Sequence, residues 1–413
     1  MLSAAIREQL AHPRELPGKV FQLSKEMTGV GMPHEPGRPG ALTVGIDATP
    51  LVGSRTGVGR YVERVSAAVA ELDDAPDQVW TLFSRRLPLS APPPRYTRLA
   101  RRNVPSAFLQ PLWRRMDRPA VEYLTGPIDV FHGGNFVMPP TRRAATVVTI
   151  HDLTFRFFPE AVQPATMAVL QRLPEAVHGY DAILTVSEAV AEEIVAELAV
   201  PRERIVVAPN GVDSSWIEPP IGADAELRRI GVPDRYFCFL GTMEPRKNLP
   251  TLLDAYAAAR AERPDLADLV IVGGAGWGER VQPPAGVRTL GYLPDADVHA
   301  LMSRAVAVCS PSVYEGFGLP VLEGMATGRP VLASDIAAHR EVAQGQATLI
   351  PVHDRDAWTQ ALLRADHGEI AVSEARRDEV VAQYTWERSA RIHLDTYAQV
   401  GGRSATSSPN SPA

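Results

Sequence analysis

Residues 314–334 have the sequence YEGFGLPVLEGMATGRPVLAS and follow an apolar run, AVAVC, at residues 305–309. This order indicates a buried strand, a glycine-containing loop, a helix that begins near Leu319, and a further strand. The Gly-Phe-Gly triplet of the loop allows a ligand to approach the backbone, and the start of the helix offers free N–H groups to an anion. Glu315 and Glu323 place carboxylates on both sides of that helix start. The segment therefore predicts a ligand site at the end of a strand in a parallel α/β sheet.

Outward from this segment, short runs rich in Val and Ile alternate with stretches of helical periodicity. This alternation is typical of a parallel sheet with helices on both faces. The first six predicted strands are residues 42–46, 79–83, 128–132, 146–150, 182–186 and 204–208. The second six are residues 236–240, 269–273, 287–290, 305–309, 330–334 and 347–350. Two series of six strands predict an α/β fold of two doubly wound, Rossmann-like domains facing across a cleft. Ligands are expected at the carboxyl ends of the strands.

The two strand series are separated by PNGVDSSWIEPPIGAD at residues 209–224, which is rich in turn-forming residues. We therefore expect a first domain over 41–213 and a second domain over 214–400. Residues 1–40 read as an N-terminal extension, partly disordered. Residues 401–413, GRSATSSPNSPA after one further glycine, are small and polar and predict a disordered tail.

Composition excludes several classes of protein. The 413 residues carry 42 basic and 48 acidic side chains, a formal net charge of −6, which gives no broad positive surface for nucleic acid. No run approaches the roughly 18 apolar residues of a membrane span, and the N-terminus lacks the apolar core of a secretory signal. We expect a cytoplasmic protein. Cys238 and Cys309 lie in apolar runs and are expected in the core.

A second candidate site segment is LGTMEPRKNLPTLLDAY at residues 240–256, at the end of the first strand of the second series. Gly241 and Thr242 form a tight exit from the strand, and Arg246 and Lys247 precede the next helix. Arg grips phosphate oxygens with two parallel hydrogen bonds, while Lys acts as a compact charge, so the pair suits a diphosphate.

The first half contributes two further candidates. His151 and Asp152 end the strand VVTI, and we expect a positioning role for His151 and a turn-holding role for Asp152. The loop TGVGRYV contains Gly57, Val58, Gly59 and Arg60 between the first strand and a helix.

These segments together resemble the retaining glycosyltransferases of the GT4 type, which have the GT-B fold. The spacing from Glu315 to Glu323 is similar to the E-x7-E signature of that family, and the segment from Glu244 to Asn248 is similar to its E-x-R-K-N element. The opening GIDATPL with GVGRY looks like bacterial polysaccharide mannosyltransferases of the family. The resemblance covers roughly residues 41–400.

The resemblance implies roles for individual residues. Glu315 and the backbone after it contact the hydroxyls of the donor sugar, and Glu323 binds the ribose. Arg246 and Lys247 neutralise the leaving diphosphate, and His151 approaches the donor sugar and the acceptor hydroxyl. The implied donor-binding set is Gly241, Thr242, Arg246, Lys247, Tyr292, Leu293, Glu315, Gly316, Phe317, Gly318, Leu319, Val321 and Glu323. Gly57, Val58, Gly59 and Arg60 form the loop near the acceptor or the diphosphate, and the last helix crosses back to the first domain.

The implied activity is transfer of a hexose from a nucleotide sugar to a hydroxyl of a glycan, a glycolipid or a small molecule, with no cofactor. GDP-mannose is the favoured donor and a UDP-hexose the second choice. A sugar-nucleotide epimerase on the same fold remains an alternative. A nicotinamide oxidoreductase would need a complete glycine fingerprint, but Val62 stands where the third glycine after Gly57 and Gly59 belongs, and Glu279 where it belongs after Gly274 and Gly276.

Acidic pairs occur at two places in the second half of the sequence. Asp295 with Asp297, and Asp354 with Asp356, have a metal-binding D-x-D spacing, but both pairs open predicted helices, so we expect no metal.

The stretch from 85 to 118 carries nine arginines and one acid. It is either a solvated loop and helix or a patch for an anionic membrane or a phosphate-bearing acceptor, which would place the protein peripherally at a membrane.

Overall fold

The computed structural model describes residues 41–53, 56–82, 89–95, 97–101, 113, 119–218, 220–274 and 283–404. The predicted extension over 1–40 and residues 405–413 of the predicted tail lie outside these residues, as does most of the arginine-rich stretch. The last helix continues to Ser404, so the prediction that the tail begins at 401 is wrong by four residues. Helical periodicity weakens at the glycine pair there, but the backbone still forms helix.

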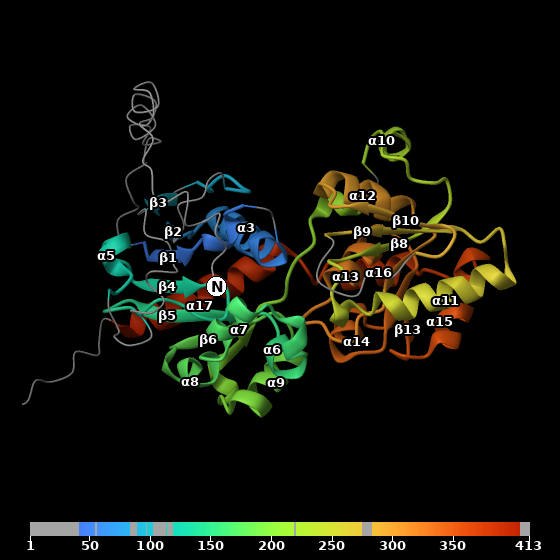
Figure 1. Cartoon of the computed structure of the whole chain (residues 1–413). Helices are drawn as coiled ribbons and strands as arrows, with labels where there is room; N and C mark the ends of the chain where they lie inside the picture. Colours follow the sequence, from blue (N-terminus) through green and yellow to red (C-terminus); the bar gives the residue numbers. More distant parts are fainter. Residues whose placement is uncertain are drawn as a thin grey trace, which may run out of the picture. The chain divides into compact units, whose positions relative to one another are not determined.

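Among the described residues, the first sheet has seven parallel strands in the order β3-β2-β1-β4-β5-β6-β7 (Figure 1). Their bounds are β1 (Thr43–Asp47), β2 (Asp77–Leu82), β3 (Thr97–Arg101), β4 (Val130–Gly133), β5 (Ala145–Ile150), β6 (Ala182–Thr185) and β7 (Ile205–Val207). The prediction of six strands missed β3. Its sequence TRLAR lacks an apolar run, which an edge strand that pairs with β2 alone can tolerate.

The second sheet has the six predicted strands in the described part of the chain, all parallel, in the order β10-β9-β8-β11-β12-β13. Their bounds are β8 (Tyr236–Leu240), β9 (Asp268–Val272), β10 (Val287–Gly291), β11 (Ala307–Ser310), β12 (Val331–Ser334) and β13 (Thr348–Ile350). The strand order reverses between β1 and β4 in the first sheet and between β8 and β11 in the second. Ligands of doubly wound sheets bind at such switch points, beyond the carboxyl ends of the strands.

Helices cover both faces of each sheet (Figure 1). In the first half they are α3 (Gly57–Ala70), α5 (Glu122–Thr125), α6 (Thr154–Phe157), α7 (Pro164–Leu170), α8 (Leu173–Ala176) and α9 (Glu188–Leu198). In the second half they are α10 (Ala223–Arg229), α11 (Leu249–Glu262), α12 (Asp295–Arg304), α13 (Leu319–Ala326), α14 (Ala337–Ala343), α15 (Arg355–Asp366), α16 (Glu374–Val381) and α17 (Trp386–Ser404).

Helix α9 shows how local sequence sets these elements. The Ser187 side chain accepts a hydrogen bond from the backbone N–H of Val190, 3.2 Å away, and so caps the first turn. Val190, Ile194 and Leu198 are buried against the sheet at the predicted helical spacing. The helix ends at Leu198, and Ala199 adopts a left-handed conformation with φ of 52°.

The core lies on both faces of the two sheets. Cys238 and Cys309 are buried within it as free thiols, as expected. Helix α17 follows the second sheet in sequence but packs on α3 and on β4, β5 and β6 of the first sheet. None of the helices within the described ranges is both long and apolar enough to cross a membrane.

Candidate functional site

A cavity of about 1140 Å³ lies at the carboxyl ends of both sheets, with walls from both halves of the chain. It contains most of the residues predicted from sequence. These are Gly57, Val58, Arg60, His151, Gly241, Thr242, Arg246, Lys247, Glu315, Gly316, Phe317, Gly318, Leu319 and Glu323. Residues that are widely separated in the sequence therefore face one another across a single space large enough for a nucleotide sugar.

Glu315 is held by three hydrogen-bond donors at the wall of this cavity. Its two carboxylate oxygens lie 2.5 Å from Lys247 Nζ and 2.7 Å from Arg246 Nη1, and Ser312 Oγ donates from 2.7 Å. Burial raises the pKa of Glu315, but the charges of Lys247 and Arg246 outweigh burial and hold that pKa well below its usual value. Glu315 is therefore ionised and fixed in position before any ligand arrives.

Arg246 also contacts Glu244 Oε1 at 2.7 Å and the carbonyl oxygen of Tyr314 at 3.0 Å. Burial lowers the pKa of Arg246, but the carboxylates of Glu315 and Glu244 raise it above its usual value. Two cations and two carboxylates thus form a balanced cluster. An incoming diphosphate would meet guanidinium and ammonium groups whose geometry is already set.

The turn before α11 presents this pair. Residues Pro245–Lys247 form one turn of 3-10 helix, and Asn248 ends it in the left-handed region with φ of 52°. Its side-chain amide donates to the carbonyls of Pro311 and Val352, at 3.0 and 3.1 Å. Asn tolerates this backbone conformation better than most residues. Its two side-chain hydrogen bonds fix the turn that carries Arg246 and Lys247.

The glycine loop after Glu315 allows very close packing. A Cβ atom added to Gly316 would lie 1.9 Å from the carbonyl oxygen of His151, and Gly318 has φ of 104°. The carbonyl of Gly316 accepts a 2.6 Å hydrogen bond from Ser187 Oγ. The loop of the second half is thus seated directly on the strand end that carries His151, which only glycine permits.

Glu323 is not free. It forms an ion pair with Arg60 of α3, and the two side chains are 5% and 14% exposed. Burial raises the pKa of Glu323 and outweighs the opposing effect of Arg60. Within the described part of the chain, Nε and Nη2 of Arg60 have no hydrogen-bond partner, and its guanidinium lies 5.6 Å from the ring centre of Trp216. Glu323, which was predicted to bind the donor, is therefore paired with Arg60 of the predicted acceptor or diphosphate loop.

His151 follows β5 and is oriented by the backbone. Its Nε2 atom lies 2.8 Å from the carbonyl oxygen of Gly134, to which it must donate. Burial lowers the pKa of His151, opposed by that hydrogen bond and by Asp152, and the neutral ring carries its lone pair on Nδ1. Asp152 accepts from the backbone N–H of Thr154 at 2.8 Å and so holds the turn, as expected.

Some contributors carry no sequence signal. The Tyr314 hydroxyl donates to Glu193 Oε2 at 2.6 Å and accepts from the backbone N–H of Leu153 at 2.7 Å. Burial is the main factor that raises the pKa of Glu193 to about 7. Nothing in the spacing of α9 distinguishes Glu193 from a solvated helix acid, because its partner lies 121 residues away.

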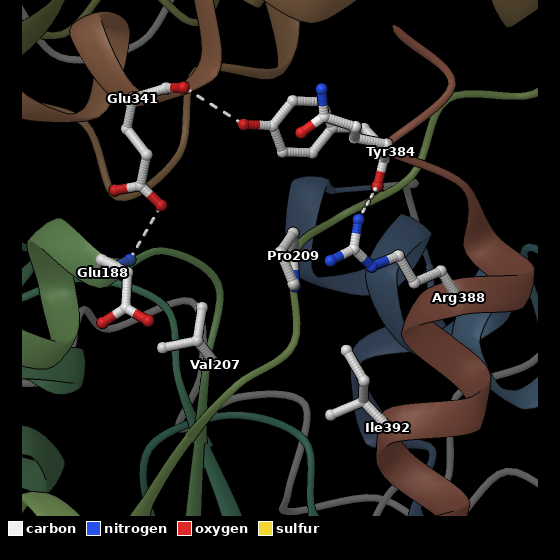
Figure 2. A pocket seen from close by; sticks show the side chains of 8 residues that line it. Glu188, Val207, Pro209, Glu341, Tyr384, Arg388 and Ile392 are labelled. Carbon is white, nitrogen blue, oxygen red and sulfur yellow. Dashed lines mark hydrogen bonds between the residues drawn. The ribbon is translucent and has the colours of Figure 1, made fainter. Parts of the chain in front are cut away.

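A second contact joins α9 to α14. The Glu341 carboxylate accepts from the backbone N–H groups of Glu188 and Ala189 at 2.8 and 2.9 Å, and so caps α9 beside Ser187. Figure 2 shows this carboxylate at the nitrogen of Glu188, with the Glu341 carbonyl near the Tyr384 hydroxyl, around a small pocket of about 200 Å³. This pocket is separate from the large cavity that holds the predicted site residues.

Four predicted ligands do not line the large cavity. Tyr292 is 61% exposed, Leu293 packs on the core from a partly buried position, and Val321 lies within the core. Gly57 to Arg60 form the first turn of α3, so the prediction that they form a loop before the helix is wrong. Gly59 is buried there, and its N–H donates to the Thr56 side chain, which caps the helix. Their roles toward a donor stay predictions.

The acidic pairs open helices, as expected. Asp295 and Asp297 lie in the first turn of α12, and Asp354 caps α15 by accepting from the N–H of Ala357 at 2.9 Å. Within the described ranges, no group of three or more His, Cys, Asp or Glu side chains is arranged to hold a metal ion.

Comparison with known proteins identifies the family of the chain. Residues 55–216 match the family model of "Glycosyltransferase Family 4", and residues 234–365 match "Glycosyl transferases group 1". The chain is 31% identical over 281 residues to O-antigen chain mannosyltransferase B of Escherichia coli, covering 65% of this chain and 74% of that protein. The chain belongs to the group 1 glycosyltransferases.

A second relative of this glycosyltransferase is the MMP alpha-(1->4)-mannosyltransferase of Mycolicibacterium hassiacum, 31% identical over 248 residues and covering 57% of each chain. Among solved structures, sucrose-phosphate synthase from Thermosynechococcus elongatus has a TM-score of 0.67 at 19% identity, covering 88% of this chain and 100% of that one. Anabaena HepE, solved with UDP and glucose, has a TM-score of 0.63 at 17% identity and covers 87% and 100%. These likenesses establish the GT-B fold.

Proposed function

We propose that this glycosyltransferase is a retaining, metal-independent mannosyltransferase that uses GDP-mannose. The observation that carries the proposal is Glu315, held between Arg246 and Lys247 beside the start of α13, with the strand end of His151 packed on the adjoining glycine loop. This arrangement combines a fixed carboxylate for sugar hydroxyls with fixed positive charge for a departing diphosphate.

Residues of the second half of the chain stabilise the diphosphate as it leaves. Negative charge builds on the leaving oxygens as the sugar becomes oxocarbenium-like. Arg246, Lys247 and the positive end of the α13 helix dipole offset that charge without reorganising. Removing one such donor typically lowers turnover by about a hundredfold or more.

Retention follows most simply from attack on the same face as the leaving group. Glu315 is poorly placed to act as the nucleophile of a double displacement, because both of its carboxylate oxygens are engaged by Ser312, Arg246 and Lys247. In the proposed route the leaving phosphate helps to deprotonate the acceptor hydroxyl, and His151 orients the sugar and the acceptor. Anomeric NMR of the first product measures the outcome, and inversion would contradict the proposal.

The mannosyl donor is supported by the Escherichia coli and Mycolicibacterium hassiacum relatives, both mannosyltransferases by name. Anabaena HepE, solved with UDP-glucose, keeps a UDP-hexose as the second candidate. A thermal-shift panel of GDP, UDP, GDP-mannose and UDP-hexoses separates them, because a ligand at 100 times its dissociation constant stabilises by about 2.7 kcal/mol. Incubation with donor alone tests the epimerase alternative, which would yield epimerised sugar.

Metal independence has a direct test. Since Arg246 and Lys247 supply the positive charge that a metal would otherwise bring, transfer should persist in excess EDTA. Loss of transfer in EDTA, with recovery on adding manganese, would contradict the proposal. The matched variant Asp295→Asn with Asp297→Asn should stay active, because these residues serve the start of α12.

The role of His151 is tested by His151→Ala, which removes the side chain and leaves the packing of its backbone on Gly316 unchanged. We expect a loss of turnover with nucleoside diphosphate affinity retained. Wild-type turnover in the folded variant would contradict the assignment.

The acceptor is proposed to be a hydroxyl of a glycan or glycolipid, met by the enzyme at the cytoplasmic face of a membrane. The arginine-rich stretch from 85 to 118 is the candidate membrane contact, although most of it lies outside the described residues. Arg98, within β3, already donates to the carbonyl of Thr125. Cosedimentation with anionic vesicles at low and high salt tests the contact, and no binding at low salt would contradict it.

A further inference from the structure

A chain of buried hydrogen bonds connects the C-terminal helix to the wall of the cavity. Its side chains come from α3, β4, β5 and α17, and each is at most 4% exposed. The members are Tyr61, His132, Thr149, His393 and Tyr397. The bond between Tyr61 and His393 joins residues 332 positions apart in the sequence.

The direction of every bond in this chain follows from one end. Nδ1 of His393 lies 2.7 Å from the carbonyl oxygen of Ser389, and a carbonyl can only accept, so Nδ1 carries the proton. Nε2 of a neutral His393 then has a lone pair and accepts from the Tyr61 hydroxyl at 2.8 Å. Since the Tyr61 hydroxyl donates its only proton to His393, it accepts a hydrogen bond from Thr149 Oγ1, 2.8 Å away.

The same logic continues to the far end. Thr149 has one hydroxyl proton and gives it to Tyr61, so Nε2 of His132 must donate to Thr149 Oγ1 at 2.7 Å. Nδ1 of His132 then accepts from the Tyr397 hydroxyl at 2.7 Å. Every donor finds one acceptor, both histidines are neutral, and their tautomers are opposite.

The protonation behaviour agrees with this assignment. Burial lowers the pKa of His393 to about 4 and lowers the pKa of His132 well below its usual value. Burial also raises the pKa of Tyr61 above its usual value. The donor and acceptor of each bond in this hydrogen-bond chain therefore stay the same throughout the neutral pH range.

Tyr61 carries the effect of this chain to the site. Its ring stands edge-on to the imidazole of His151, with 4.7 Å between ring centres and 85° between planes, and Tyr61 itself lines the large cavity. The ring of Phe136 also lies near His151, with 6.0 Å between ring centres. The backbone of Phe136 has a φ of 61°, and its N–H donates to the carbonyl oxygen of Thr149. The imidazole of His151 thus has an aromatic neighbour whose own angle is fixed by α17.

We propose that Tyr61 and His393 are positioning residues for glycosyl transfer, with His393 of α17 fixing the Tyr61 ring that orients His151. This proposal rests on the role assigned to His151 under the proposed function. The competing interpretation is that the chain only fastens α17 to the first sheet, in which case its loss would lower stability and leave catalysis intact.

The first experiment compares three variants in steady-state transfer assays. Tyr61→Phe keeps the ring and removes its hydroxyl, and His393→Leu removes the acceptor that holds it. Tyr397→Phe removes one hydroxyl from the far end of the same chain and is the matched control for a buried hydrogen bond. We expect kcat to fall about tenfold or more for the first two, with donor KM unchanged, and to stay near wild type for Tyr397→Phe.

Rescue adds a readout that packing alone would not change. His393→Gln places an amide near the position of Nε2, where its oxygen can accept from Tyr61, so it should recover more of kcat than His393→Leu at equal stability. Equal kcat in Tyr61→Phe, His393→Leu and Tyr397→Phe would overturn the proposal even if His151→Ala is inactive. An active His151→Ala variant would overturn the proposed function and this inference together.

A spectroscopic test addresses the chain itself. Nitrogen-15 NMR of the histidine side chains at pH 7 should show His393 protonated on Nδ1 and His132 protonated on Nε2. The Tyr61→Phe variant should disturb the resonances of His393 and His151. The reverse tautomers, or a cationic His393 at pH 7, would overturn the proposal.

Discussion

Replacing Arg60 by Met should destabilise the protein strongly, and more at alkaline than at acidic pH. Arg60 is the ion-pair partner of Glu323, whose side chain is only 5% exposed. Removing one partner of a buried pair leaves an uncompensated charge and typically costs about 3 to 5 kcal/mol. Met keeps the length and apolar character of the side chain, so lost packing contributes little.

The pH dependence follows from the sign of the pKa change. Burial already raises the pKa of Glu323 above its unfolded value, and loss of Arg60 raises it further. The folded variant then binds a proton that the unfolded chain releases, so its stability falls as pH rises through the folded pKa of Glu323. Below the unfolded pKa, near 4.3, the carboxyl is neutral in both states and the deficit is smallest.

The assay measures urea unfolding for a double-mutant cycle, with tryptophan fluorescence as the signal, at pH 5 and at pH 8. The cycle comprises wild type, Arg60→Met, Glu323→Gln and the double variant. Because Gln carries no charge, the double variant should recover much of the stability that Arg60→Met loses at pH 8. An Arg60→Met protein within about 0.5 kcal/mol of wild type at both pH values would refute the buried-pair argument, since that is the size of an ordinary surface change.

Three further outcomes are expected. Arg246→Ala should lower kcat/KM by about a hundredfold or more with folding intact, and unchanged kcat/KM would contradict the diphosphate assignment. Gly316→Ala should abolish most activity, because its Cβ would lie 1.9 Å from the His151 carbonyl oxygen, whereas Gly179→Ala, with open space around its Cβ, should behave as wild type. The pKa of His393 is depressed by burial to about 4, so its stabilisation is complete above pH 6.5 and is lost as pH falls toward 4, by about 3 kcal/mol. Urea unfolding of His393→Leu should show a correspondingly weaker loss between those pH values.

Much of the fold was predictable because its signals are local. Buried parallel strands need apolar residues on both faces, so most of the strands stand out as short apolar runs. The edge strand β3 was not predicted because Arg98 and Arg101 interrupt its apolar residues, whereas the other edge strands, β7, β10 and β13, carry a more apolar sequence. Glycines after strand ends, and charged residues just before helices, likewise marked Gly316 and Arg246, since backbone approach and anion binding require those residue types at those places.

By itself, the sequence determined the two doubly wound sheets and the loops at their carboxyl ends where ligand-binding residues gather. Only the tertiary structure decided which side chains meet. Arg60 with Glu323, Tyr314 with Glu193, and Tyr61 with His393 are each more than a hundred positions apart in the chain. Periodicity and capping act over a few residues, whereas these partners depend on how α3, α9, α13 and α17 pack, and burial then sets their charge and protonation.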